Sequence, residues 1–209
     1  LRRNPHSHSP ATIDEVRYHV TEDAAAEYKR FLAGDLHLTE TVPPARLVEL
    51  QTRHGDTLHI SPYLGVFFLG INLRQGPLAE SLALRRALSL AIDRERLVST
   101  ITGMGEHPAE RLLPPALDLP SSITAENLTA AQREARARAL YAEAGFSPES
   151  PLQLELRFNT STPHRRMALA VAAMWREVLG VRTRLRNEEW KVFVQNRRQG
   201  RVTEVFRGG

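Results

Sequence analysis

Cysteine is absent from the 209 residues of this sequence, and lysine occurs only at Lys29 and Lys191. A chain without cysteine has no disulfide, no thiol nucleophile and no cysteine-bound metal, although this leaves the cellular compartment open. No apolar run approaches the roughly 20 residues that cross a bilayer. The chain also does not open with the charged segment, apolar stretch and cleavage site of a signal peptide. We therefore expect a water-soluble chain without a signal peptide, any export signal having been removed or never present.

The motifs of common enzyme classes are missing as well, since the sequence contains no GxSxG, P-loop, HExxH or GxGxxG. Glu188 and Glu189 precede Trp190, and an exposed helix start explains this pair better than two catalytic carboxylates. His6 and His8 lie in a polar lead-in without further ligands at metal spacing, so a surface loop explains them best. We predict that the chain is not an enzyme, holds no metal and uses no cofactor.

What the sequence does contain suits a globular protein. Hydrophobic residues make up 42% of the chain, enough for one sizeable domain or two small ones. The net charge is +4 and the pI is near 9.9, a balance that can indicate an anionic partner. Basic and acidic residues alternate along most of the chain, however, which is typical of a solvated surface. We therefore expect no nucleic-acid partner.

The central stretch from residue 66 to 102 has the clearest pattern. The apolar run from Val66 to Ile71 is too short for an ordinary helix and favours a strand buried on both faces. Gly76 and Pro77 break it, and helical spacing follows at Leu84, Ala87, Leu88, Ala91 and Ile92. Asp93 ends this helix and can cap the next, over residues 94–102.

Strands and helices are predicted to alternate along most of the chain, which indicates an α/β architecture. Strands are expected at residues 13–20, 36–41, 58–62, 65–73, 152–158, 181–185 and 202–206. Helices are expected at 23–33, 45–52, 130–144, 164–179 and 188–199, the first capped by Thr21.

Three segments carry a resemblance to a known family. They are FLAGDLHLTETVPP, LGINLRQGPLAESLALRRALSLAIDRERLV and LRFNTSTPHRRMALAVAAMWREVLGVRTRLRNEEWKVFVQNRRQG. In this order they resemble segments of the extracytoplasmic solute-binding proteins of peptide ABC transporters, the oligopeptide-binding family, also called family 5. The similarity covers nearly the whole chain.

The resemblance implies a fold and a division into lobes. The fold would be periplasmic-binding-protein-like, of the two-lobed type II, with mixed sheets flanked by helices. Residues 1–69 would belong to the first lobe and residues 70–209 to the second, peptide-cleft lobe. The chain would cross between the lobes near Leu69, where Gly65 and Gly70 allow a strand to bend. Family members are much longer, so this chain looks like an internal fragment that lacks part of the cleft.

The resemblance also implies a function, namely the binding of short peptides between two lobes for delivery to the permease subunits of an ABC importer, outside the cytoplasmic membrane. It places His164, Trp190, Arg197 and Arg207 in the peptide cleft. His164 and the arginines would serve the carboxyl end of the peptide, and Trp190 would wall a side-chain pocket. The spacing from Gly200 to Arg207 is one residue longer than in some family members.

Other interpretations of these residues stay open at this point. His164 could be an ordinary imidazole in the first turn of a helix, Trp190 a core residue, and the two arginines solvated charges. The alternative function is a basic α/β nucleic-acid-binding module, in which Arg182, Arg184 and Arg186 line one strand face and meet phosphates. Gel shifts with unrelated DNA would separate the two, because phosphate binding weakens steeply with salt.

Overall fold

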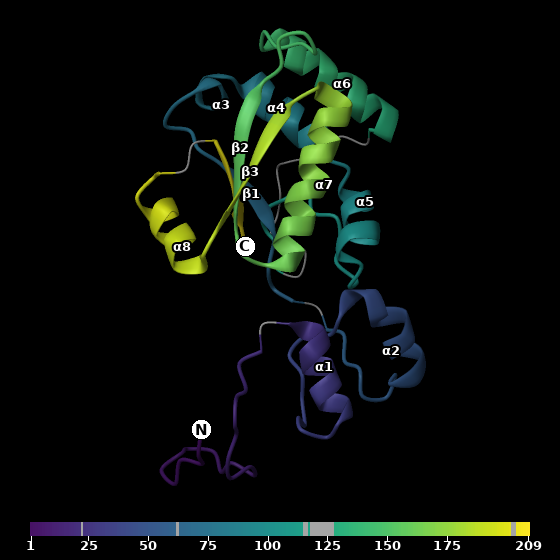
Figure 1. Cartoon of the computed structure of the whole chain (residues 1–209), viewed down its shortest axis with the longest axis vertical. Coiled ribbons are helices and arrows are strands. Elements are labelled where there is room, and N and C mark those ends of the chain that lie inside the picture. Colours follow the sequence, from purple (N-terminus) through teal and green to yellow (C-terminus); the bar gives the residue numbers. More distant parts are fainter. Residues whose placement is uncertain (22, 62, 115–116, 118–127, 202–203) are drawn as a thin grey trace. The chain divides into compact units, whose positions relative to one another are not determined.

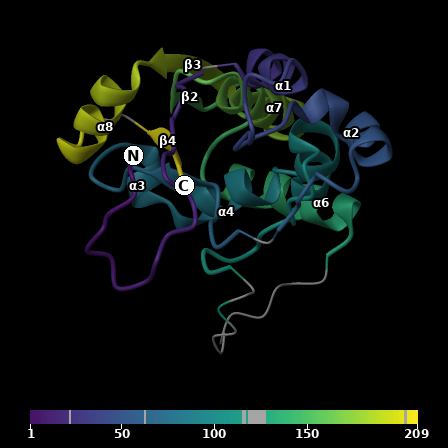
Figure 2. The same ribbon diagram turned by 90° about the horizontal axis from the view of Figure 1, so that it is seen from below.

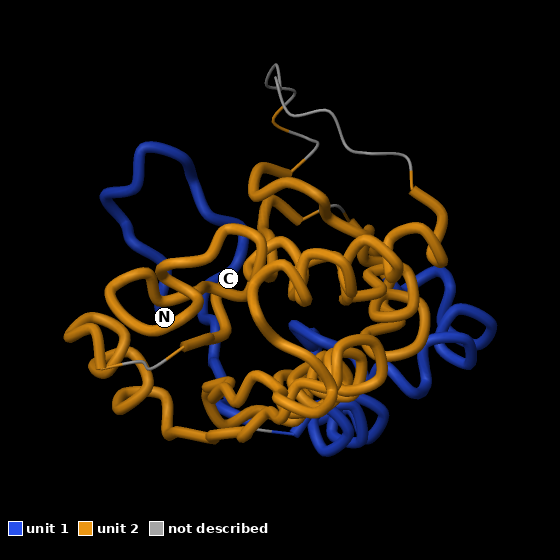
Figure 3. Tube along the Cα trace, turned by 90° about the horizontal axis from the view of Figure 1, so that it is seen from above, with its two compact units in different colours: residues 1–58 blue, residues 59–209 orange. Residues whose placement is uncertain are grey.

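The computed structural model describes residues 1–21, 23–61, 63–114, 117, 128–201 and 204–209. The chain divides into two compact units, Leu1–Leu58 and His59–Gly209, coloured separately in Figure 3. None of the helices in the described ranges is long and apolar enough to span a bilayer. The predicted boundary between lobes near Leu69 concerns the complete protein and stays a prediction.

The first unit is built on two short helices. They are α1 (Ala24–Leu32) and α2 (Leu47–Arg53), the second preceded by the 3-10 turn η1 (Pro44–Arg46). The side chain of Asp23, rather than the predicted Thr21, caps α1 by accepting a hydrogen bond from the Ala26 N–H at 2.7 Å. Tyr28 and Leu50 are the buried residues of the two helices.

The prediction of strands at residues 13–20, 36–41 and 58–62 is wrong for the residues that the structure describes; Pro62 lies outside them. In the described part of the first unit, an isolated antiparallel bridge between Arg2 and Glu15 is the extent of β pairing. Tyr18, Val20 and Leu38 are correspondingly exposed. A strand forms only where its backbone groups pair with a neighbour, and alternation along the sequence cannot supply that neighbour.

A four-stranded mixed sheet organises the second unit, in the order β1-β4-β2-β3 (Figure 1). The strands are β1 (Phe68–Ile71), β2 (Gln153–Asn159), β3 (Arg182–Glu188) and β4 (Val205–Gly208). β2 runs parallel to both β3 and β4, whereas β1 pairs antiparallel with β4. The predicted α/β fold with a mixed sheet flanked by helices is confirmed here. Residues 202–203 of the last predicted strand lie outside the described residues.

Helices cover both faces of this sheet. They are α3 (Pro77–Glu80), α4 (Leu82–Leu90), α5 (Arg94–Arg96) continued by the π-helical turn η2 (Leu97–Thr102), α6 (Ala130–Glu143), α7 (Thr162–Leu179) and α8 (Trp190–Arg198). Figure 1 shows α8 on the opposite side of the sheet from α7, and α4 lies beside α6 (Figure 2). The last helix begins later than predicted, because Glu188 ends β3 and is buried rather than exposed, while Glu189 caps α8.

The main core lies between β2 and the helices α4, α6 and α7. Leu154, Leu156 and Phe158 alternate along β2 and all point into it. Trp175 of α7 is buried there, and its indole N–H donates to the Leu88 carbonyl at 2.9 Å. That carbonyl belongs to the last turn of α4, where carbonyls lack a partner within the helix, so one side chain both fills the core and completes a helix end.

We expect Trp175→Phe to lower the free energy of unfolding by about 2 kcal/mol, because it removes core volume and leaves the Leu88 carbonyl without its donor. The matched control is Trp190→Phe, because Trp190 is 51% exposed. We expect this substitution to change the free energy of unfolding by less than about 0.5 kcal/mol. Urea unfolding followed by circular dichroism measures both. Equal losses would contradict the central place of Trp175 in the core.

Candidate functional site

His164, Arg207 and Phe67 meet where β2 leads into α7. His164 is in the first turn of α7, Arg207 is on β4, and Phe67 immediately precedes β1. The ring centroids of Phe67 and His164 are 6.1 Å apart, and the Arg207 guanidinium carbon lies 5.5 Å from the centroid of Phe67. Three segments far apart in the sequence thus bring a cation and an imidazole to the same aromatic ring.

The surroundings of His164 keep its imidazole neutral at neutral pH. Burial, and then the positive charge of Arg207, lower its pKa from 6.5 to about 4, while the backbone of Asn159 acts in the opposite direction. The Nδ1 atom is buried and has no hydrogen-bond partner within the structure. A buried polar atom without a partner is unusual in a native protein, so this atom is suited to a ligand or an ordered water.

Arg197 and Trp190 lie on α8. The Arg197 guanidinium carbon is 4.9 Å from the centroid of the Phe206 ring and 5.6 Å from that of Phe193. Trp190 stacks on Phe193 with centroids 6.2 Å apart, yet its side chain is 51% exposed. The interpretation of Trp190 as an ordinary core residue is therefore wrong. It lines an open depression on α8 together with Lys191, Val194, Gln195, Arg198 and Gln199.

The two arginines are close enough to affect one another. Burial, followed by the charge of Arg197, lowers the pKa of Arg207, but an arginine stays charged at neutral pH. Across the described residues, neither guanidinium makes an ion pair with an acidic side chain, and Arg207 Nε is buried without a hydrogen-bond partner. Two cations without a counterion make this part of the second unit attractive to an anion such as a carboxylate.

A buried ionic network lies beside these cations and was not predicted. Glu155 and Arg157 of β2 pair with each other, and both are almost fully buried. Arg157 also reaches Glu188 at 3.3 Å, and the amide of Asn196 on α8 donates to the same Glu188 oxygen at 3.0 Å. Burial raises the pKa of Glu155, but hydrogen bonds from Arg157 and Arg184 outweigh it, so its pKa is lowered. The network ties α8 to the sheet.

Two of the three arginines on which the nucleic-acid hypothesis rests take part in the same network. Arg184 pairs with Glu155, and Arg186 lies 3.3 Å from Glu188 and 3.9 Å from Glu155. A guanidinium held by a carboxylate offers less charge to a phosphate than a free one. The positions of Arg184 and Arg186 are therefore better explained by pairing within the sheet, whereas Arg182 makes no ion pair among the described residues.

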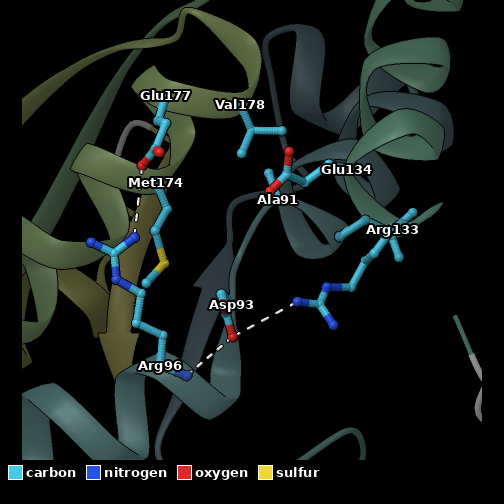
Figure 4. Close-up of a pocket in the computed structure, with 9 residues that line it drawn as sticks. Ala91, Asp93, Arg96, Arg133, Glu134, Met174, Glu177 and Val178 are labelled. Carbon is cyan, nitrogen blue, oxygen red and sulfur yellow. Dashed lines mark hydrogen bonds and ion pairs between the residues drawn. The ribbon is translucent and has the colours of Figure 1, made fainter. Parts of the chain in front are cut away.

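A second recess lies on the far side of the core, between the end of α4, the start of α5, and helices α6 and α7. It holds about 50 Å³ and is lined by Leu90, Ala91, Asp93, Arg96, Arg133, Glu134, Met174, Glu177 and Val178 (Figure 4). Ion pairs from Arg96 to Glu177 and from Arg133 to Asp93, each 3.7 Å long, bridge its walls. It is too small for a peptide, and its charges are already paired.

The structure thus groups the four predicted residues in two sets. His164 and Arg207 share the ring of Phe67, and Trp190 and Arg197 share α8 with Phe193. The aromatic residues Phe67, Phe193 and Phe206 were not among the predicted site residues. No signal in the sequence indicated Phe206, because neighbours on a strand point to opposite faces and Phe206 therefore faces away from Arg207. Its contact with Arg197 required the position of α8.

The comparisons with known proteins agree on one family. The model of bacterial extracellular solute-binding proteins, family 5 middle, matches residues 1–209. The periplasmic murein peptide-binding protein MppA of Escherichia coli is 34% identical over 190 residues, which are 90% of this chain and 35% of that protein. The periplasmic oligopeptide-binding protein OppA of Salmonella typhimurium is 33% identical over 214 residues, 100% of this chain and 39% of that protein.

Solved structures support the same fold. The E. coli murein tripeptide binding protein MppA matches with a TM-score of 0.77 and 35% identity, over 88% of this chain and 36% of that chain. Haemophilus influenzae OppA, solved in complex with RPPGFSPFR, matches with a TM-score of 0.78 and 28% identity, over 88% of this chain and 37% of that chain. The chain therefore spans little more than a third of the length of these relatives.

The low pKa of His164 has a consequence for stability. Because the pKa falls from 6.5 to about 4 on folding, the unfolded chain takes up this proton first as the solution is acidified. The contribution of His164 to stability is therefore complete above pH 6.5 and is lost as the pH falls from 6.5 towards 4. We expect His164→Gln to reduce the pH dependence of the urea midpoint in that interval.

We also expect Arg207→Gln to raise the pKa of His164 without restoring 6.5, since burial, the larger cause, remains. An NMR titration of the imidazole measures this, with His164→Gln identifying the signal. Arg182→Gln, at the start of β3, removes the same charge from a position that does not contribute to the shift. A His164 pKa near 6.5 in the unmodified chain would contradict the described burial.

Proposed function

We propose a peptide-binding role for this chain, which belongs to family 5 of the bacterial extracellular solute-binding proteins. The observation that supports this role most directly is the pair Arg197 and Arg207. Neither guanidinium has an acidic partner among the described residues, and Arg207 lies beside the neutral imidazole of His164. An unmodified peptide presents a carboxylate at its C-terminal end, and this group fits such a site.

The recognition needs no bond breaking. Arg197 and Arg207 attract the terminal carboxylate, and each can offer it parallel N–H donors that match its two oxygens. The unpartnered Nδ1 of His164 adds a neutral polar contact. Trp190, half exposed beside the apolar stems on α8, forms one wall of a side-chain pocket. Ligand side chains would otherwise sit in wet pockets, as binding of many different peptides requires.

In the complete protein, we propose that residues 1–69 belong to one lobe and residues 70–209 to the other, with the crossing near Leu69. Closure of the lobes around a short peptide would precede its delivery to the permease subunits of an ABC importer. We place the protein outside the cytoplasmic membrane, because the matched relatives are described as periplasmic. These proposals concern the complete protein, whereas this chain spans little more than a third of the length of its relatives.

The carboxylate site is tested with trialanine and its C-terminal amide, titrated into the 209-residue chain and followed by NMR of the arginine side chains. We expect trialanine to shift the signals of Arg197 and Arg207, and the amide to bind several-fold more weakly, because it lacks the charge. Arg207→Gln should weaken binding of the acid at least about fivefold. Arg182→Gln, with the same loss of charge, should leave it unchanged. Equal binding of trialanine and its amide would contradict the proposal.

The strength of binding by the chain alone is a separate prediction. Because the chain spans little more than a third of its relatives, we expect it to supply one wall of the cleft and to bind more weakly than micromolar. Isothermal titration with mixed tri- to pentapeptides measures this. Micromolar or tighter binding would mean that the described residues form a complete site.

A further inference from the structure

Two phenylalanines of the antiparallel pair β1–β4 each lie over a glycine of the opposite strand. Gly70 is opposite Phe206, and Gly208 is opposite Phe68. A Cβ atom on Gly70 would overlap the ring of Phe206, and one on Gly208 would overlap the ring of Phe68. Neither glycine has a positive φ, so each is needed for the close approach of a ring rather than for its backbone conformation.

Only one of these two similar rings holds a cation in the described residues. The guanidinium carbon of Arg197 lies 4.9 Å from the centroid of Phe206, and the buried Phe193 holds the same guanidinium at 5.6 Å. No such contact is found for Phe68 among the described residues. Both Phe68 and Phe206 are half-buried on the same face of the sheet, so the arginine is what distinguishes them.

We infer that Phe206, seated on Gly70, is a positioning residue that holds Arg197 ready for a carboxylate. The value of this inference for binding rests on the proposed function. An aromatic face attracts a cation without accepting its N–H bonds, whereas an acidic partner would neutralise the charge and occupy the donors. A guanidinium stacked against two rings keeps the donors in its own plane free.

Preorganisation is the physical reason that this should matter. A long arginine side chain loses considerable rotamer entropy when it is fixed in one geometry. Where aromatic rings have already restricted Arg197, less of that loss falls on the binding step. A Cβ atom on Gly70 would overlap the ring of Phe206, and that ring holds the guanidinium of Arg197. The absence of a side chain at residue 70 therefore affects the position of an arginine on α8.

The first experiment measures Arg197 itself, in the 209-residue chain without ligand. We expect Phe206→Ala to lower the order parameter of the Arg197 Nε–H group, measured by nitrogen-15 relaxation, with Arg197→Lys identifying the signal. Phe68→Ala is the matched control, since it removes the equivalent ring over the equivalent glycine, and it should leave that order parameter unchanged. Equal values in Phe206→Ala and the unmodified chain would overturn the inference.

The second experiment tests the consequence for binding. We expect Phe206→Ala to weaken trialanine about fivefold, the size of one cation–π contact at a partly exposed site, and to leave binding of the trialanine amide unchanged. A ring with only a structural role would weaken acid and amide alike, and that result would count against the inference. Phe68→Ala should change neither.

Gly70→Ala keeps both phenylalanines and tests the seat of the ring. In the otherwise unmodified chain, we expect Gly70→Ala to lower the order parameter of Arg197 as Phe206→Ala does. When Gly70→Ala is combined with Phe206→Ala, we expect no further decrease, because the ring that the added methyl group would displace is already absent. An additive effect would overturn the proposed link. If the unmodified chain binds acid and amide equally, the proposed function fails, while the order of Arg197 still decides the role of Phe206.

Discussion

Burial of β2 on both faces is the constraint on which the second unit depends. Its apolar residues Leu154, Leu156 and Phe158 face the helical core, but Glu155 and Arg157 between them are almost equally buried on the other face. Charges taken out of water must be paired, and here the partners come from β3. Glu188 at the end of β3 then binds Asn196, so the network that satisfies the sheet also places α8, and with it Trp190 and Arg197.

The unpaired cations stand out against this network. Five charged residues of β2 and β3 pair with one another, namely Glu155, Arg157, Arg184, Arg186 and Glu188. Arg197 and Arg207 instead have aromatic neighbours in place of carboxylates among the described residues. A buried ion pair mainly fixes geometry, because its attraction is offset by the cost of desolvation. A guanidinium against a ring keeps its charge available. The chain thus uses ion pairs to build the sheet, whereas Arg197 and Arg207 contact aromatic rings.

The relatives of this chain indicate which ligands to compare with this arrangement of side chains. The relatives include proteins described as binding murein peptides and oligopeptides, ligands that share a backbone and a terminal carboxylate but vary in their side chains. Under the proposed function, the guanidinium groups, the neutral imidazole and the exposed tryptophan would recognise what these ligands share. Phe206 and Gly70 add a feature of this chain, in which the close approach of two strands is connected to a charged side chain on α8.

The sequence by itself determined the family, the α/β class and the helices of the second unit, because ordered segments, helical periodicity and glycine stops are local features. It also suggested His164, Trp190, Arg197 and Arg207 as site residues, and their role stays a prediction. It failed for the strands of the first unit, which alternate in sequence but pair only through the isolated Arg2–Glu15 bridge among the described residues. It also failed for Glu188, which is buried and contacts Arg157 and Asn196. Only the tertiary structure decided which cations remain unpaired and which rings hold them, because those contacts join residues far apart in the chain.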